Sequence, residues 1–106
     1  MIQELTPQEA FNLMHRKKEL IILDTRTQEE FHQSHIKNAK LLDLSNPLIM
    51  QELQQFPKEK EYLLYCHTGG RSSYVLQIMN QLGYKKIQHI HGGLQSWEHQ
   101  GLPVGK

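Results

Sequence analysis

The chain has a single cysteine and no apolar run long enough to cross a membrane. Because Cys66 has no partner in the chain, an intramolecular disulfide is excluded, and no second thiol could resolve an adduct formed on the first. No stretch approaches the roughly 20 apolar residues of a transmembrane helix, and residues 1–4 lack the basic start and apolar core of a signal peptide. We therefore expect a cytoplasmic protein with no membrane partner.

An excess of charge of either sign is also missing. Lysine and arginine together number 12, and aspartate and glutamate number 11. This near balance gives no support for binding to nucleic acid or to a membrane surface. The 106 residues suffice for one hydrophobic core but not for two, so the sequence predicts one domain over residues 1–106.

Strand and helix patterns alternate along the chain. Thr6 and Thr27 each precede a glutamate three residues later, which is the capping box of a helix start. A third helix is expected to open at Asn46-Pro47 and to stop before Pro57. The predicted strands are 2–5, 20–23, 41–42, 62–65 and 87–90, and the predicted helices are 7–17, a short one from 28, 46–56, 73–82 and 94–99. This alternation predicts an α/β fold with a mostly parallel central sheet flanked by helices on both faces, and ligands beyond the carboxyl ends of the strands.

Cys66 stands where one of these strands ends and a glycine-rich turn begins. Gly69 and Gly70 permit the backbone conformations in which successive N–H groups converge on an anion, and the following helix adds its own unpaired N–H groups. Together with the Arg71 cation, this setting favours a thiolate, which is a nucleophile. The alternative is an inert buried cysteine, but such a residue does not need a glycine-rich turn at a helix N-terminus.

The segment Cys66-His67-Thr68-Gly69-Gly70-Arg71-Ser72 resembles the active-site loop of the rhodanese family. Small single-domain members of that family carry Cys-x-x-Gly-x-Arg-Ser. The resemblance extends along most of the chain, in the segments Asp24-x-Arg26-x-x-x-Glu30-Phe31, His35-Ile36-x-x-Ala39 and Gly92-Gly93-x-x-x-Trp97-x-x-x-Gly101-x-Pro103. Ser34 and Asn38 depart from it, since the family usually has glycine there, and they bring the local turn geometry into question.

The resemblance implies a sulfurtransferase with a rhodanese-like domain. Cys66 is then the catalytic nucleophile, which takes the outer sulfur of a small anionic donor such as thiosulfate or a polysulfide and holds it as a persulfide. The acceptor is cyanide, a small thiol or a protein thiol, and no cofactor or metal is needed. The loop from His67 to Ser72 binds the substrate, while Asp24 serves as scaffold and Arg26 supports the rim of the loop.

Two alternatives stay open at this point. One is a cysteine-dependent phosphatase or arsenate reductase, but phosphatases place five residues between cysteine and arginine, and here four separate Cys66 from Arg71. The other is a sulfur-relay carrier or a non-catalytic binding module, which sequence cannot separate from a free-standing enzyme.

The seven histidines raise a metal hypothesis. His32 and His35 have helical spacing, and His89 and His91 share a strand face, but neither pair has a local cysteine or a recognisable zinc spacing. We therefore predict no metal site. His67 differs from the others because its place in the loop could add positive charge near a substrate as the pH falls. Trp97 is expected in the core.

Overall fold

The centre of the fold is a five-stranded sheet in which all strands pair in parallel, in the order β1-β5-β4-β2-β3. A computed structural model describes residues 2–105, so the ends of the predicted domain, residues 1 and 106, lie outside the described residues. The strands are β1 (Ile2–Leu5), β2 (Ile21–Asp24), β3 (Lys40–Leu41), β4 (Glu61–Tyr65) and β5 (Lys86–Ile90). The predicted α/β class is confirmed, and β4 occupies the middle of the sheet.

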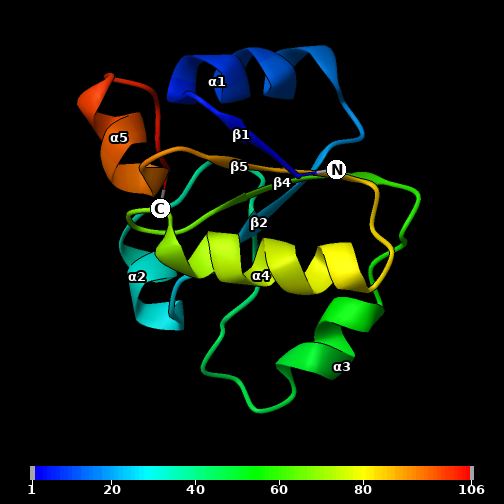
Figure 1. Cartoon of the computed structure of the whole chain (residues 1–106). Coiled ribbons are helices and arrows are strands. Elements are labelled where there is room, and N and C mark those ends of the chain that lie inside the picture. Colours follow the sequence, from blue (N-terminus) through cyan, green and yellow to red (C-terminus); the bar gives the residue numbers. More distant parts are fainter. Residues whose placement is uncertain (1, 106) are drawn as a thin grey trace.

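Helices cover both faces of this sheet (Figure 1). They are α1 (Pro7–Arg16), α2 (Gln28–Gln33), α3 (Ile49–Gln54), α4 (Gly70–Gln81) and α5 (Gly93–His99). The helices α1 and α5 lie on one face, and α3 and α4 lie on the other, with α2 near the N-terminal end of α4 (Figure 1). Within residues 2–105 no helix is both long enough and apolar enough to cross a membrane.

Both predicted capping boxes are confirmed as helix starts. The Thr6 hydroxyl accepts from the backbone of Glu9, and Thr27 pairs with Glu30 in the same way. Side-chain oxygens of this kind satisfy backbone N–H groups that a helix start leaves unpaired. These local contacts fix the beginnings of α1 and α2.

Two other predicted helix starts were wrong. The Asn46 side chain accepts from the Leu48 N–H at 3.0 Å, and the Asn46 carbonyl accepts from the Ile49 N–H, so a turn occupies the predicted start and α3 begins only at Ile49. By contrast, α4 begins at Gly70, three residues ahead of the predicted Ser73. Strand β3 is likewise shifted by one residue, to Lys40–Leu41.

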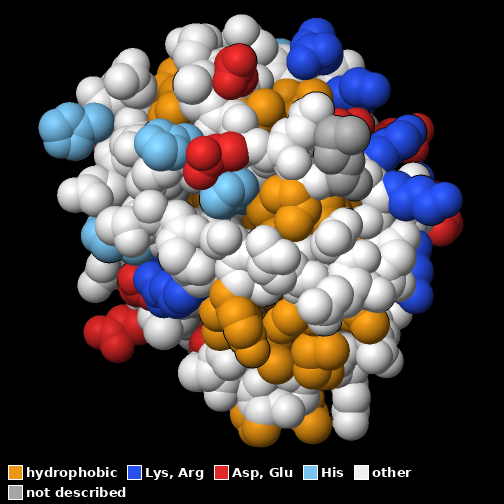
Figure 2. Space-filling model, viewed as in Figure 1, with side chains coloured by type: hydrophobic (Ala, Val, Ile, Leu, Met, Phe, Trp, Pro, Cys, Tyr) orange, Lys and Arg blue, Asp and Glu red, His pale blue; other side chains and the backbone are white. Residues whose placement is uncertain are grey.

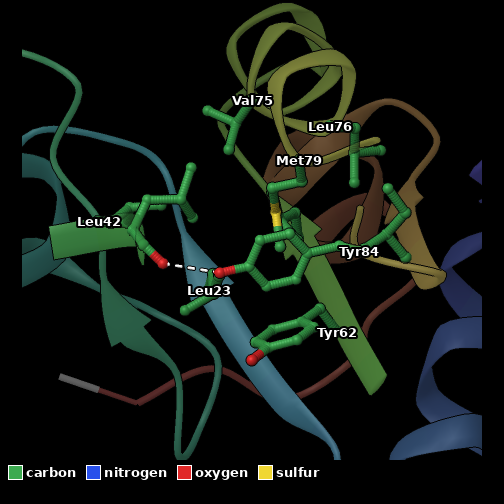
Figure 3. Close-up of a cluster of buried hydrophobic side chains, with 10 residues drawn as sticks. Leu23, Leu42, Tyr62, Val75, Leu76, Met79 and Tyr84 are labelled. Carbon is green, nitrogen blue, oxygen red and sulfur yellow. Dashed lines mark hydrogen bonds between the residues drawn. The ribbon is translucent and has the colours of Figure 1, made fainter. Parts of the chain in front are cut away.

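The core divides into two clusters, one on each face of the sheet. On the α3/α4 face, the edge of the Tyr62 ring meets the Tyr84 ring, and Met79 of α4 packs beside them (Figure 3). The Tyr84 hydroxyl donates to the carbonyl oxygens of Leu53 and Phe56, at 2.9 and 2.7 Å. On the α1/α5 face Trp97 is buried, as predicted. This packing holds the strands, and with them their carboxyl ends, in place.

The two departures from the family pattern are accommodated in the backbone. Asn38 has a φ of 70°, in the left-handed region where glycine is favoured and asparagine is one of the better tolerated alternatives. Ser34 has a φ of −170°, which is extended backbone open to any residue. The turn therefore forms without glycine at either position.

Candidate active site

Cys66 directly follows β4, at the carboxyl end of the central strand. Its side chain is buried, with 1% of its surface exposed. The next two residues, His67 and Thr68, are exposed, and the chain then turns at Gly69 into α4. The thiol thus lies at the base of a short loop whose outer residues face solvent, at the edge of the sheet where ligands of open parallel sheets bind.

The loop and the start of α4 surround the sulfur with hydrogen-bonding groups. The Gly69 N–H donates to Cys66 Sγ at 3.0 Å, and Sγ lies 3.7 Å from Ser72 Oγ. Gly69 has a φ of 115°, which a residue with a side chain adopts only under strain, and it caps α4 without a side-chain hydrogen bond. The first turn of α4 therefore presents backbone N–H groups and a positive helix end toward this region. This arrangement is suited to a negatively charged sulfur.

A second glycine pair supports the loop from the opposite side. The N–H groups of Leu94 and Gln95, in the first turn of α5, donate to the carbonyl oxygens of Cys66 and His67 at 2.8 and 3.0 Å. A side chain on Gly93 would place its Cβ 2.4 Å from the Cys66 carbonyl oxygen. The Gly92-Gly93 pair thus gives α5 its close approach to the loop.

The Arg71 guanidinium binds a carboxylate of another helix. It forms a two-point ion pair with Glu30 of α2, at 2.8 and 3.1 Å. Hydrogen bonding to Arg71 is the main reason that the pKa of Glu30 is lowered to about 2, and the same pair raises the pKa of Arg71. Arg71 therefore ties the start of α4 to α2. The sequence did not predict the pairing of Glu30 with Arg71, because nothing local links Glu30 to a residue 41 positions later.

Asp24 and Arg26 form a buried ion pair behind the loop. The Asp24 carboxylate, with none of its surface exposed, accepts from the Arg26 backbone N–H, Nε and Nη2 at 2.8 to 3.1 Å. Arg26 also donates to the Ser34 carbonyl and lies over the Tyr65 ring. Asp24, for which the sequence predicts a scaffold role, lies in this buried pair, and so does Arg26, for which it predicts support of the loop rim. The Arg26 guanidinium is bound to Asp24 in this pair, and only 4% of the residue is exposed.

Ser72 connects the sulfur to a histidine that sequence reasoning did not place in the site. Ser72 Oγ lies 3.2 Å from His89 Nδ1, and His89 Nε2 lies 3.3 Å from Glu4 Oε2. Glu4 is also 3.2 Å from His91 Nδ1. Burial lowers the pKa of His89, with a smaller effect of His91 in the same direction, and Glu4 acts against both. The parallel pairing of β1 with β5 brings Glu4 opposite His89.

The histidine pairs considered for metal binding have other contacts. His35 stacks on Phe31, and His89 and His91 both contact Glu4. Among residues 2–105 no group of three or more histidine, cysteine, aspartate or glutamate side chains is placed to hold a metal ion.

Comparison with known proteins gives matches over nearly the whole chain. Residues 6–100 match the family described as "Rhodanese-like domain". The thiosulfate sulfurtransferase GlpE of Coxiella burnetii is 32% identical over 92% of this chain and 89% of its own length. A sulfurtransferase of Allochromatium vinosum is 28% identical over 98% of this chain and 95% of its own length. The crystal structure of a rhodanese-like domain protein from Staphylococcus aureus aligns with a TM-score of 0.82 at 30% identity, covering 98% of this chain and 99% of the other.

Proposed function

The chain belongs to the rhodanese-like domain family, and on that premise we propose that it is a sulfurtransferase that carries sulfane sulfur as a persulfide on Cys66. The proposed donor is thiosulfate or a polysulfide, and the proposed acceptor is cyanide or a thiol. The name of the Coxiella burnetii relative supports thiosulfate as the donor to be tried first. Cytoplasmic residence remains a prediction from the sequence.

One observation carries this proposal. The only thiol of the chain lies at the base of a loop in which the Gly69 N–H donates to its sulfur at 3.0 Å. A donor at that distance stabilises an anionic sulfur, and the first turn of α4 adds the positive end of a helix dipole. Such a site favours both the attacking thiolate and the persulfide anion that replaces it.

The proposed reaction needs only sulfur chemistry. The Cys66 thiolate attacks the outer sulfur of thiosulfate, the S–S bond of the donor breaks, and sulfite leaves with the electron pair. Cys66 then carries a persulfide. In the second half, the carbon of cyanide or the sulfur of a thiolate attacks the outer persulfide sulfur, and the Cys66 thiolate is released. No electrons are gained or lost over the cycle, so no cofactor is required.

Mass spectrometry of the intact protein tests the proposal. Incubation with thiosulfate and no acceptor should add the mass of one sulfur atom to the peptide that contains Cys66. Adding cyanide should restore the original mass and release thiocyanate, because no resolving cysteine competes for the persulfide. The Cys66→Ala variant is the control and should stay unmodified. An unchanged mass with both thiosulfate and a polysulfide would refute the proposed function.

The same experiment separates the alternatives. If phosphate esters are hydrolysed while no sulfur is gained, the protein is a cysteine-dependent phosphatase. If the persulfide forms but passes faster to protein thiols than to cyanide, the protein is a relay carrier. Four residues separate Cys66 from Arg71, whereas five separate cysteine from arginine in phosphatases. The shorter loop encloses a smaller group, which favours a sulfur atom over a phosphate. If neither sulfur transfer nor phosphate-ester hydrolysis occurs, the protein is a non-catalytic binding module.

A further inference from the structure

A line of polar contacts runs from the Cys66 sulfur to the edge of the sheet. Cys66 Sγ lies 3.7 Å from Ser72 Oγ, which lies 3.2 Å from His89 Nδ1, and His89 Nε2 lies 3.3 Å from the Glu4 carboxylate. Cys66, Ser72 and His89 are buried, and about half of the Glu4 side chain is exposed. Figure 2 shows histidine and acidic side chains gathered on the face of the molecule that also carries α4. Ser72, His89 and Glu4 belong to α4, β5 and β1, and Cys66 directly follows β4.

The protonation of His89 follows from these neighbours. Glu4 Oε2 lies 3.3 Å from Nε2, and because a carboxylate can only accept, it favours the tautomer with the hydrogen on Nε2. In the neutral ring, Nδ1 then has a free lone pair directed at Ser72. Burial lowers the pKa of His89, which keeps the ring neutral near pH 7 and able to take a proton. The Ser72 hydroxyl can donate either to Nδ1 or to the Gly69 carbonyl oxygen, which also lies at 3.2 Å.

We propose that His89 is a positioning residue that takes the thiol proton of Cys66 through the Ser72 hydroxyl, and that Glu4 stabilises the imidazolium. The inference rests on the proposed function in one respect, namely that Cys66 is the nucleophile. It adds a residue to the site from β5, in a position outside the loop motif.

The proton transfer balances without any other reactant. The S–H bond of Cys66 breaks and its proton goes to Ser72 Oγ, while the proton already on Ser72 goes to His89 Nδ1. The products are a thiolate and an imidazolium. The two hydrogen bonds between Cys66 and His89 then point the other way, because Nδ1–H donates to Ser72 and the Ser72 hydroxyl donates to the sulfur. The thiolate thus gains a second donor beside the Gly69 N–H.

The surroundings of His89 act on its charge in opposite directions, and burial, the largest effect, disfavours the imidazolium. Glu4 approaches from β1 and favours the imidazolium, whereas His91, which directly follows β5, disfavours it. Ser72 approaches from α4 and carries no charge, and Cys66 acts only through Ser72. The arrangement has the logic of a nucleophile, a base and an orienting carboxylate, with a hydroxyl inserted between the first two.

The rate of Cys66 alkylation by iodoacetamide as a function of pH tests the proposal. This assay reads the thiolate in the resting protein and needs no sulfur donor, so its outcome is independent of whether thiosulfate is a substrate. His89→Gln cannot accept a proton, and we expect its reactivity profile to move up by about one pH unit, with roughly tenfold slower alkylation at pH 7. Ser72→Ala should shift the pH profile of alkylation by the same amount, and combining it with His89→Gln should produce no further shift.

The matched control is His91→Gln. It removes an imidazole that contacts the same carboxylate but not Ser72, and His91 disfavours the His89 imidazolium, so its profile should not move to higher pH. A His89→Gln profile that superimposes on the wild type, or one that is uniformly slower without a shift in pH, would overturn the proposal. Circular dichroism establishes that the variants are folded.

A second measurement decides the matter even if His89→Gln fails to fold. The imidazole nitrogens of His89 are followed by NMR against pH in the wild type and in Cys66→Ala. Coupling between the two sites is reciprocal, so loss of the thiolate should move the titration of His89 to lower pH. Identical His89 titrations in the two proteins would show that no proton is shared along the line.

Discussion

Gly93 is the position at which one added methyl group probes how the active-site loop is held. In Gly93→Ala the new Cβ meets the carbonyl oxygens of Cys66 and His67 at 2.4 and 2.6 Å, where separations under 3.0 Å essentially never occur. These are backbone atoms, so the loop itself has to move. A displacement approaching 1 Å in a positioned reaction costs on the order of 100-fold in rate. We expect Gly93→Ala to lose about 10- to 100-fold in sulfur transfer.

The chain contains a control for the backbone strain of this substitution. Gly101 has a φ of 75°, close to the 62° of Gly93, but an added Cβ there meets nothing within 4 Å. Alanine in the left-handed region costs roughly 1–2 kcal/mol at either position. Gly101→Ala should therefore lose a similar part of the unfolding free energy while its sulfur-transfer rate stays within about twofold of the wild type.

Two assays measure these effects separately. Thiocyanate formation from thiosulfate and cyanide gives the rate, and urea unfolding gives the stability. Both variants are compared at a temperature where each is fully folded, and iodoacetamide alkylation of Cys66 reports on the loop if sulfur transfer is too slow to follow. Equal rates in Gly93→Ala and Gly101→Ala would refute the idea that α5 positions the loop.

The other predictions concern the nucleophile and the two ion pairs. Cys66→Ser should abolish thiocyanate formation with an unchanged circular dichroism spectrum, because a serine hydroxyl is not ionised near neutral pH; more than trace turnover contradicts the mechanism. Arg71→Lys should lose more activity than its conserved charge suggests, because an ammonium cannot form the two-point pair with Glu30, and wild-type kinetics would show that only the charge matters. Asp24→Asn should lower the unfolding free energy by about 3–5 kcal/mol, since it leaves the buried Arg26 charge without its partner, and a loss below about 1 kcal/mol in urea unfolding would contradict this. Because the pKa of folded Glu30 is lowered to about 2, its pairing stabilises the protein above pH 4.5 and is lost as the pH falls toward 2. At pH 7 the unfolding free energy of the wild type should exceed that of Glu30→Gln by about 1 kcal/mol, after allowance for solvent screening. Urea unfolding at pH 7 and at pH 3 should show this difference becoming smaller at the lower pH.

Local signals in the sequence predicted local structure well. The threonine–glutamate capping boxes predicted where α1 and α2 begin, because both partners lie within one turn. The prediction failed where two local signals compete. Asn46-Pro47 is compatible with a helix start and with a turn, and the side-chain bond from Asn46 to Leu48 selects the turn. The early start of α4 has a similar cause, since Gly69 in the left-handed conformation serves as its cap.

The same distinction between local and long-range signals holds for the residues of the site. The placement of Cys66 at a strand end followed from periodicity and the glycine-rich turn, and the structure brings Gly69 and Ser72 to its sulfur. Glu30 and His89 could not be found in this way. Their contacts depend on which strands and helices are neighbours in space, and neither the order of the strands nor the approach of α2 to α4 is encoded in residue spacing.

The pairing of β1 with β5 also bears on how the protein is made. During synthesis Ile2 leaves the ribosome long before Ile87, with which it pairs. At about 5–20 residues per second, β1 waits several seconds for its neighbour, and until then neither edge of its backbone is paired with another strand of the sheet. The line from Glu4 to His89 forms only at that last step. A nascent chain stalled before residue 86 could already contain Cys66, but it would lack the strand that carries His89.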